Sequence, residues 1–242
     1  EWDEVGRPKA RYALIGEPTS LTPIHAHKGI MMEKIRITGK AGHSSNPSLG
    51  NNALDAMHAV MSELMVYRQG LKQKYRDANF VIDYPTMNFG CIHGGDNPNR
   101  ICGRCELEFD IRALPGMNNA ALFQEISAIL PQIEQQTRTK IELNHLFPDV
   151  PSFFTEKESD IIKACERLTQ KEATSVAFAT EGPFLNQLGM ETLVLGPGSI
   201  DQAHQPNEFM ALDQIAPMQH VIKGLVERYC LTPSTENEAT RV

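Results

Sequence analysis

Hydrophobic and polar side chains along the middle of the chain follow two different periods. Residues 29–39 alternate apolar and charged positions, which is typical of a strand. Residues 52–75 and 119–136 repeat apolar side chains at helical spacing, which predicts two amphipathic helices. The strand pattern returns in three further segments, 86–95, 103–114 and 140–147. The order strand, helix, strand, strand, helix, strand predicts a ferredoxin-like α+β module.

The sequences on either side of this module alternate strands with helices. Short buried strands are expected at 11–16 and 192–195, and helices at 156–170 and 211–229. Such alternation predicts an α/β fold with a mixed or parallel sheet, here interrupted by the inserted α+β domain. The expected segments are 1–27 and 150–232 for the α/β domain, 28–149 for the insertion and 233–242 for a flexible polar tail.

Two details of the expected helices follow from single residues. Ser48 or Asn51 is expected to cap the helix that starts near residue 52, because both side chains can accept a hydrogen bond from a free backbone N–H group. Pro131 lies inside the pattern of the second helix and is expected to end or kink it, because proline lacks the N–H donor that the helix needs.

Composition narrows the classes of function. The chain has 242 residues, 41% of them hydrophobic, which is a globular composition. A net charge of -7 and a pI near 5.6 argue against a nucleic-acid partner. The absence of a long apolar run argues against a membrane-spanning helix. Five cysteines, an odd number, favour a reducing compartment, so a cytoplasmic protein is expected.

Two residues at expected strand ends are candidates for chemistry. Glu17 follows the strand at 11–16, and His204 follows the strand at 192–195. Ligands of open α/β sheets bind beyond the carboxyl ends of the strands, and a carboxylate with an imidazole suits zinc or cobalt. Two ligands are too few for a catalytic metal site. On the residues alone, a turn glutamate and a hydrogen-bonded loop histidine remain the alternative.

Four motifs stand in an order that resembles a known enzyme family. They are GEPTSLTPIHAHKG, GHSSNPSLGNNA, NFGCIHGGDNPNRICGRCELEFDIRALPG and LVLGPGSIDQAHQPNE. Together they resemble the co-catalytic zinc aminoacylases and carboxypeptidases, over about residues 11 to 231. The resemblance implies that the α/β domain is catalytic. It also implies that the insertion is a dimerisation or lid domain, so a homodimer is expected.

The resemblance assigns metal-binding and catalytic roles to three residues. It implies that Glu17 and His204 are metal ligands, with two Zn²⁺ or Co²⁺ ions in the complete site. It implies that His43, on the inserted domain, reaches the partner subunit's active site and stabilises the oxyanion. The chemistry is consistent, because a bound metal lowers the pKa of water toward ~7 and a histidine can donate to the developing negative charge.

Asn99 and Arg112 are implied to bind the carboxylate of the substrate, an N-acyl amino acid. An arginine can hold a carboxylate with two parallel hydrogen bonds. Arg112 could instead be the ion-pair partner of Asp110 or Glu108, and Arg100 is an equally available cation. The assignment of Arg112 therefore depends on the family pattern.

Two further pairs are implied to contact the substrate. Thr180 and Glu181 fall where the family places a substrate-lining loop after a strand. Gly196 and Gly198 resemble a turn whose backbone N–H groups meet the substrate carboxylate.

The implied reaction removes the acetyl group from N2-acetyl-L-ornithine in arginine biosynthesis. The alternatives are a desuccinylase or dipeptidase of the same family, or a truncated, non-catalytic module that dimerises or binds a metabolite. The family's further metal ligands and general base come from an H-x-D motif and a Glu-Glu pair, and the sequence contains neither. We therefore expect an incomplete enzyme that is inactive on its own, in which the full metal site does not form.

The remaining histidines and the C-x-x-C motif are interpreted structurally. Surface or packing roles are expected for His25, His27, His58, His145 and His220, and a turn role for His93. Cys102 and Cys105 enter an expected strand, whereas a redox C-x-x-C begins a helix, so no redox role is expected.

Overall fold

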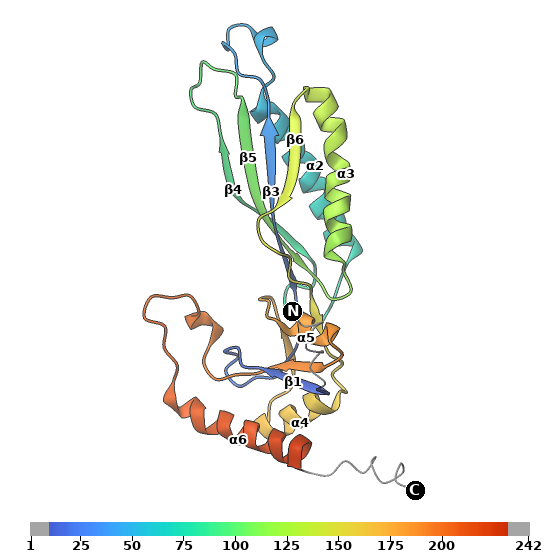
Figure 1. Ribbon diagram of the computed structural model, residues 1–242, viewed down its shortest axis with the longest axis vertical. Coiled ribbons are helices and arrows are strands. Elements are labelled where there is room, and N and C mark those ends of the chain that lie inside the picture. Colours follow the sequence, from blue (N-terminus) through green and yellow to red (C-terminus); the bar gives the residue numbers. More distant parts are fainter. Residues whose placement is uncertain (1–9, 232–242) are drawn as a thin grey trace, which may run out of the picture. The chain divides into compact units, whose positions relative to one another are not determined.

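The chain divides into two compact units in the computed structural model, which describes residues 10–231 (Figure 1). The inserted unit comprises residues 27–152 and 177–179, and the split unit comprises the described residues of 1–26, 153–176 and 180–242. The insertion expected at 28–149 falls within the inserted unit. The tail expected at 233–242 and the first nine residues of the segment 1–27 lie outside the described residues.

The inserted unit has the ferredoxin-like order that the sequence predicts. Its elements are β3 (Gly29–Thr38), a 3-10 turn (Pro47–Leu49), α2 (Ala53–Lys74), β4 (Thr86–Gly94), β5 (Arg104–Ala113), α3 (Asn119–Thr137) and β6 (Lys140–His145). The strands form one antiparallel sheet in the order β4-β5-β3-β6. This confirms the predicted α+β insertion.

The alternation along β3 and β5 builds the core of the inserted unit. On β3, Met31, Ile35 and Ile37 are fully buried, and so is Glu33 on the same face, while Met32, Lys34 and Arg36 between them are half-buried. Leu107 and Ile111 on β5 lie in the same core cluster. Helices α2 and α3 cover this face of the sheet (Figure 1). The period of two therefore identified the buried face correctly.

Neither Ser48 nor Asn51 caps α2, and Pro131 does not end α3, so both predictions were wrong on these points. The N-cap of α2 is Asn52, whose side chain accepts from the backbone N–H group of Leu54 at 3.0 Å. Helix α3 continues through Pro131 to Thr137. Pro131 is exposed, whereas Leu130 and Ile133 beside it are buried. Burial of these apolar neighbours outweighs the loss of one hydrogen bond on the solvent side of the helix.

The split unit is an α/β fold with a mixed sheet, as predicted. Its strands are β1 (Tyr12–Ile15), β2 (Ile24–His27), β7 (Phe153–Phe154), β8 (Thr174–Val176) and β9 (Glu191–Val194). The order is β1-β9-β2-β7, and β8 also pairs with β2. Strand β9 is parallel to β1 and antiparallel to β2.

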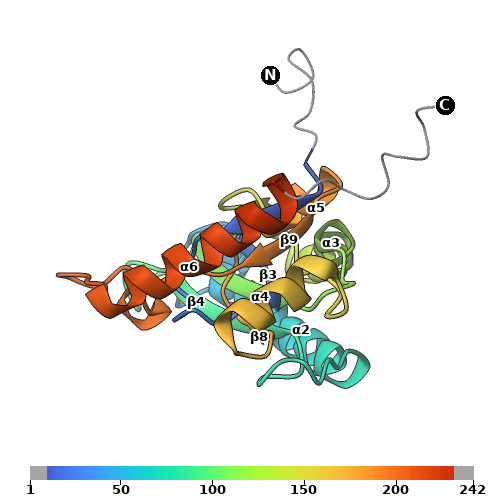
Figure 2. The same cartoon turned by 90° about the horizontal axis from the view of Figure 1, so that it is seen from below.

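Helices cover both faces of this sheet. They are α4 (Asp160–Thr169), α5 (Gly182–Gln187) and α6 (Ile215–Val226), with 3-10 turns at Ile200–Gln202 and Leu212–Gln214 and a π-helical turn at Glu227–Leu231. Leu193 and Leu195 pack with α4 and α6, which lie side by side (Figure 2). Val194 faces the other way and packs with Ile15 and Phe153. Within residues 10–231, no helix is both long and apolar enough to cross a membrane.

Strands β2 and β7 of the split unit were not predicted. Strand β7 has two residues, too few for any pattern. Strand β2 carries His25 and His27, which read as polar positions although both are buried. Their Nδ1 atoms lie 3.0 Å from the carbonyl oxygen of Thr155 and 2.9 Å from that of Lys28. Each buried ring thus has a hydrogen bond to the backbone through Nδ1, which fits the expected packing role.

Candidate functional site

The loops that follow β1 and β9 lie against each other at one edge of the sheet. The strands are parallel, with Ile15 opposite Val194, so the segments that follow them leave the sheet at the same edge. The carbonyl oxygen of Gly196 accepts from the N–H groups of Thr19 at 3.2 Å and Leu21 at 3.0 Å. A Cβ atom at position 196 would lie 2.4 Å from the carbonyl oxygen of Glu17. This close approach explains why residue 196 is glycine.

The N–H groups of the glycine turn have acceptors within the split unit. Gly196 donates to Thr19 Oγ1 at 3.2 Å, and Gly198 donates to Gln214 Oε1 at 2.8 Å. Gly198 has a φ of 87°, in the left-handed region that favours glycine. A carboxylate that binds these groups must displace two side-chain acceptors. Substrate binding by Gly196 and Gly198 therefore stays a prediction.

The two predicted metal ligands both belong to the split unit. Glu17 is half-buried and directly follows the Gly16 turn after β1. His204 is exposed and has a φ of 61°, after the 3-10 turn at Ile200–Gln202. Among residues 10–231, neither belongs to a group of three His, Cys, Asp or Glu side chains close enough to share an ion. Their donor atoms suit a metal, but the described residues do not complete the site.

Thr180 and Glu181 directly precede α5. Thr180 is buried, and its Oγ1 accepts from the N–H group of Gly182 at 3.1 Å. Glu181 is exposed, and its carbonyl oxygen accepts from the N–H group of Phe184 at 3.0 Å. Both residues therefore have a local role in starting the helix. Their predicted contact with the substrate remains a prediction.

His43 and Asn99 lie together on two exposed loops of the inserted unit. The N–H group of Ser44 donates to the carbonyl oxygen of Asn99 at 3.0 Å, and His43 forms a β-bridge with Arg100. The Nδ1 atom of His43 accepts from the N–H group of Ser45 at 3.2 Å and lies 2.6 Å from Ser45 Oγ. A ring nitrogen that accepts carries no proton, so the neutral ring has its proton on Nε2. His43 thus presents a hydrogen-bond donor.

Arg112 lies at the opposite end of the same sheet. It pairs with Ile30 at the start of β3, whereas the loop that contains Asn99 precedes Arg104, which is opposite Thr38. Positions 104 and 112 of β5 are about 26 Å apart at the usual rise of a strand. The predicted clamp of Arg112 with Asn99 therefore does not form within one chain. Arg112 Nε instead pairs with Asp110 Oδ2 at 3.0 Å, the alternative that the sequence left open.

A cluster that the sequence did not indicate comprises Glu33, His145 and Asp149. His145 Nδ1 lies 2.9 Å from Glu33 Oε1 and 3.5 Å from Asp149 Oδ1. The His145 ring also stacks on Phe123 of α3, with 4.2 Å between the ring centroids. Burial raises the pKa of Glu33 from its ordinary 4.5 to about 7, and the neighbouring His145 opposes that rise. The packing role expected for His145 is thus real but incomplete.

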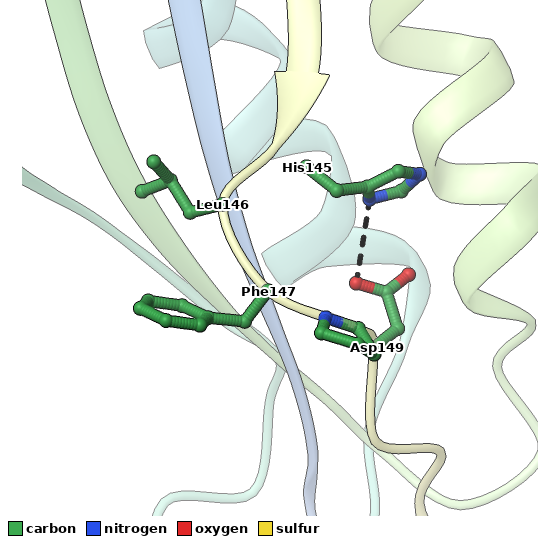
Figure 3. A pocket seen from close by; sticks show the side chains of 5 residues that line it. His145, Leu146, Phe147 and Asp149 are labelled. Atoms are coloured by element: carbon green, nitrogen blue, oxygen red, sulfur yellow. Dashed lines mark ion pairs between the residues drawn. The ribbon is translucent and has the colours of Figure 1, made fainter.

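A hollow of about 380 Å³ opens beside this cluster and is lined by residues 145–149. Figure 3 shows the His145 ring at the end of β6 facing the Asp149 carboxylate. Glu33 carried the available signal, because it occupies a buried, apolar position in the alternation of β3. His145 is 112 positions further along the chain, so no local motif connects the two residues.

Comparison with known proteins agrees with the fold of the two units. Residues 25–138 match the peptidase dimerisation domain of the M20 type. Over 222 residues the chain is 47% identical to an acetylornithine deacetylase of Vibrio cholerae, covering 92% of this chain. The chain is a homologue of the acetylornithine deacetylases. It spans 58% of the length of that deacetylase.

Solved structures of proteins with low sequence identity to this chain share its fold. A tripeptidase from Staphylococcus aureus superposes with a TM-score of 0.72 at 17% identity, covering 91% of this chain and 57% of that one. A protein from Bacillus subtilis described as a dinuclear metal-binding M20 peptidase has a TM-score of 0.59 at 12% identity, covering 88% and 55%. At these identities the likeness establishes the fold, which combines the inserted dimerisation domain with an α/β sheet.

Proposed function

We propose that this chain is part of a metal-dependent amidohydrolase that removes the acetyl group from N2-acetyl-L-ornithine, giving ornithine and acetate in arginine biosynthesis. The observation that carries the proposal is the 47% identity to an acetylornithine deacetylase over 222 residues. That identity extends over both units of the fold, so it is not a property of the dimerisation domain alone.

His43 is the proposed oxyanion donor. The bond from the Ser45 N–H group to Nδ1 leaves the Nε2–H group to donate, and the side chain is exposed. A donor of this kind stabilises the negative charge that develops when an amide carbonyl is attacked. We propose that the inserted unit forms a homodimer and that His43 acts in the partner subunit's active site. The match of residues 25–138 to a peptidase dimerisation domain supports the dimer.

Glu17 and His204 are the proposed metal ligands, with Zn²⁺ or Co²⁺ as the ion. A Bacillus subtilis protein of the same fold is described as binding a dinuclear metal, which supports a dinuclear site here. A carboxylate and an imidazole are suitable donors, but a complete site needs ligands beyond these two. We therefore infer that residues 10–231 alone do not hold both ions and that the 242-residue chain is inactive by itself.

The remaining predicted residues are proposed to contact the substrate at different places. Asn99 lies beside His43, so it would act in the same partner site. Gly196 and Gly198 lie beside Glu17, so they would act in the subunit's own site together with Thr180 and Glu181. Arg112 belongs to neither place, and its binding of a substrate carboxylate would need release from Asp110.

We propose a cytoplasmic location. All five cysteines lie in the described part of the chain and carry free thiols, two of them exposed. Free exposed thiols are typical of a reducing compartment, in which an amino-acid biosynthetic enzyme would work.

The test compares the 242-residue chain with a longer protein that includes the coding sequence in frame before residue 1. Both are loaded with Zn²⁺ or Co²⁺ and assayed with N2-acetyl-L-ornithine, N-succinyl-diaminopimelate and dipeptides. We expect the longer protein to prefer the acetyl substrate and a chelator to remove the activity. His43→Ala should lower kcat by about 100- to 1000-fold. His58→Ala, an exposed histidine on α2, is the matched control.

Other outcomes would replace the proposal. Preference for the succinyl substrate or for dipeptides would indicate a desuccinylase or a dipeptidase. No hydrolysis of any substrate by the longer protein would favour the non-catalytic dimerising or binding module. Full activity of the 242-residue chain would contradict the inferred need for further ligands.

A further inference from the structure

The Glu33, His145 and Asp149 cluster has the geometry of a cation site. Glu33 on β3 and His145 on β6 are directly opposite each other in the antiparallel register. Asp149 follows four residues after His145, in the segment that leaves β6. One ligand atom from each of the three side chains lies within 4.8 Å of the others, and within residues 10–231 this is the one such group.

Two carboxylate oxygens of the cluster are buried without a hydrogen-bond donor among residues 10–231. They are Glu33 Oε2 and Asp149 Oδ1. The Glu33 side chain has no exposed surface. A buried acceptor without a partner destabilises the folded state, and more so when it is charged. Burial also raises the pKa of Asp149. Each carboxylate therefore has one buried oxygen that no hydrogen-bond donor or cation among the described residues neutralises.

His145 alone cannot neutralise both carboxylates. Its Nδ1 atom is the nitrogen that faces both carboxylates, and it can offer a single N–H group. At 2.9 Å from Glu33 Oε1 this group makes one good hydrogen bond, and at 3.5 Å Asp149 Oδ1 is beyond a normal bond length. A cation in place of that proton would contact both acids and the ring nitrogen together.

The spacing of the ligand atoms suits zinc. Zinc binds imidazole nitrogen and carboxylate oxygen at about 2.0–2.2 Å, so two ligands of a tetrahedral ion are about 3.3–3.5 Å apart. The observed separations from His145 Nδ1, 2.9 and 3.5 Å, are close to this value. Calcium and magnesium prefer six or more oxygen ligands, so the mixed nitrogen and oxygen set disfavours them.

We propose that Glu33, His145 and Asp149 bind one zinc ion in the inserted unit. The stacking of His145 on Phe123 holds the ring plane, which fixes the direction of the Nδ1 lone pair. His145 and Asp149 also line the hollow formed by residues 145–149 (Figure 3), and a water molecule would be the fourth ligand of the ion. Neither Glu17 nor His204 takes part, so the site does not depend on the proposed function.

The ion would fasten the segment that follows β6 to β3. Val150 and Ile30 already exchange two backbone hydrogen bonds, of 2.8 and 3.0 Å, and Asp149 directly precedes Val150. Binding of the ion by Glu33 and Asp149 would add a further link between β3 and the segment that follows β6. Because a preformed site binds the ion in the folded state, zinc should raise the temperature of unfolding.

The test uses Zn²⁺ alone with the 242-residue chain. The chain is stripped with a chelator, titrated with Zn²⁺ in a calorimeter, and analysed for bound metal and for Tm. We expect one tightly bound ion and a rise in Tm on its addition. His145→Ala and Asp149→Asn should each weaken binding of that ion by at least about 100-fold and remove the rise in Tm. Circular dichroism of the stripped proteins verifies that each variant is folded.

Two controls separate this site from the residues proposed for the active site. The double variant Glu17→Gln with His204→Ala should keep the ion and the Tm rise, and His58→Ala should behave as the wild type. Stoichiometric Zn²⁺ binding that survives in folded His145→Ala or Asp149→Asn would overturn the proposal. So would a wild-type chain that binds no zinc, which would mean that the cluster holds a proton alone. No activity is measured, so failure here leaves the deacetylase proposal intact.

Discussion

Single residues show where chemistry can be inferred from sequence and where it cannot. His43 stands in a GHSSNP motif, and the structure adds that Ser45 fixes its proton on Nε2. Glu33 stands in a strand pattern where its charge conflicts with its buried register. That conflict indicates a special site, but its partner His145 is known only once β3 and β6 are paired. Contacts between distant strands are therefore what the sequence lacks.

Glu106 gives a pH-dependent prediction at this scale. Hydrogen bonds from Arg104 at 2.5 Å and Arg36 at 2.7 Å lower the pKa of Glu106 from its ordinary 4.5 to about 2. A lowered pKa means that the unfolded state binds the proton more readily. The stabilisation is therefore complete above pH 4.5 and is lost as the pH falls toward about 2.

We expect Glu106→Gln to lower the urea midpoint of unfolding near pH 7 and to differ little from the wild type near pH 2. Urea titrations monitored by circular dichroism at both pH values provide the measurement. Glu63→Gln, at an exposed position of α2, serves as the control. A difference between Glu106→Gln and the wild type that is equally large at both pH values would contradict the ion-pair explanation.

Whole elements were more predictable than their ends. The four strands and two longer helices of the inserted unit follow from periodicity, because each buries one face against a single core. The cap of α2 was assigned to Ser48 or Asn51, since several polar residues before the helix are chemically equivalent in the sequence. Backbone conformation selects Asn52. The prediction that Pro131 ends α3 failed for a related reason, because the sequence does not show that this proline faces solvent.

The cap of α2 can be tested by truncation. Asn52 accepts a hydrogen bond from the N–H group of Leu54 at 3.0 Å, one of the groups that the helix itself cannot satisfy. Asn52→Ala should lower the free energy of unfolding by about 1 kcal/mol in urea denaturation. Asn52→Asp keeps the acceptor and should be nearly neutral. Equal losses in both variants would show that the cap bond is not the cause.

At the scale of the whole molecule, the predicted site residues other than Arg112 fall into two groups. Glu17, His204, Gly196 and Gly198 belong to the split unit, and His43 with Asn99 belongs to the inserted unit. If the active site combines both groups across a dimer, each subunit supplies His204 to its own site and His43 to the partner's. A single chain then cannot display the complete site. The central claim about function is therefore that each active site forms only in the dimer.

Heterodimers of the longer protein, purified through two different tags, test that claim most directly. One heterodimer pairs a His43→Ala subunit with a His204→Ala subunit. It should retain about half of the wild-type deacetylation of N2-acetyl-L-ornithine, because one of its two sites receives both histidines intact. The second pairs a wild-type subunit with a subunit that carries both His43→Ala and His204→Ala, and it should be inactive. The reverse result, an inactive first heterodimer and a half-active second, would contradict the account.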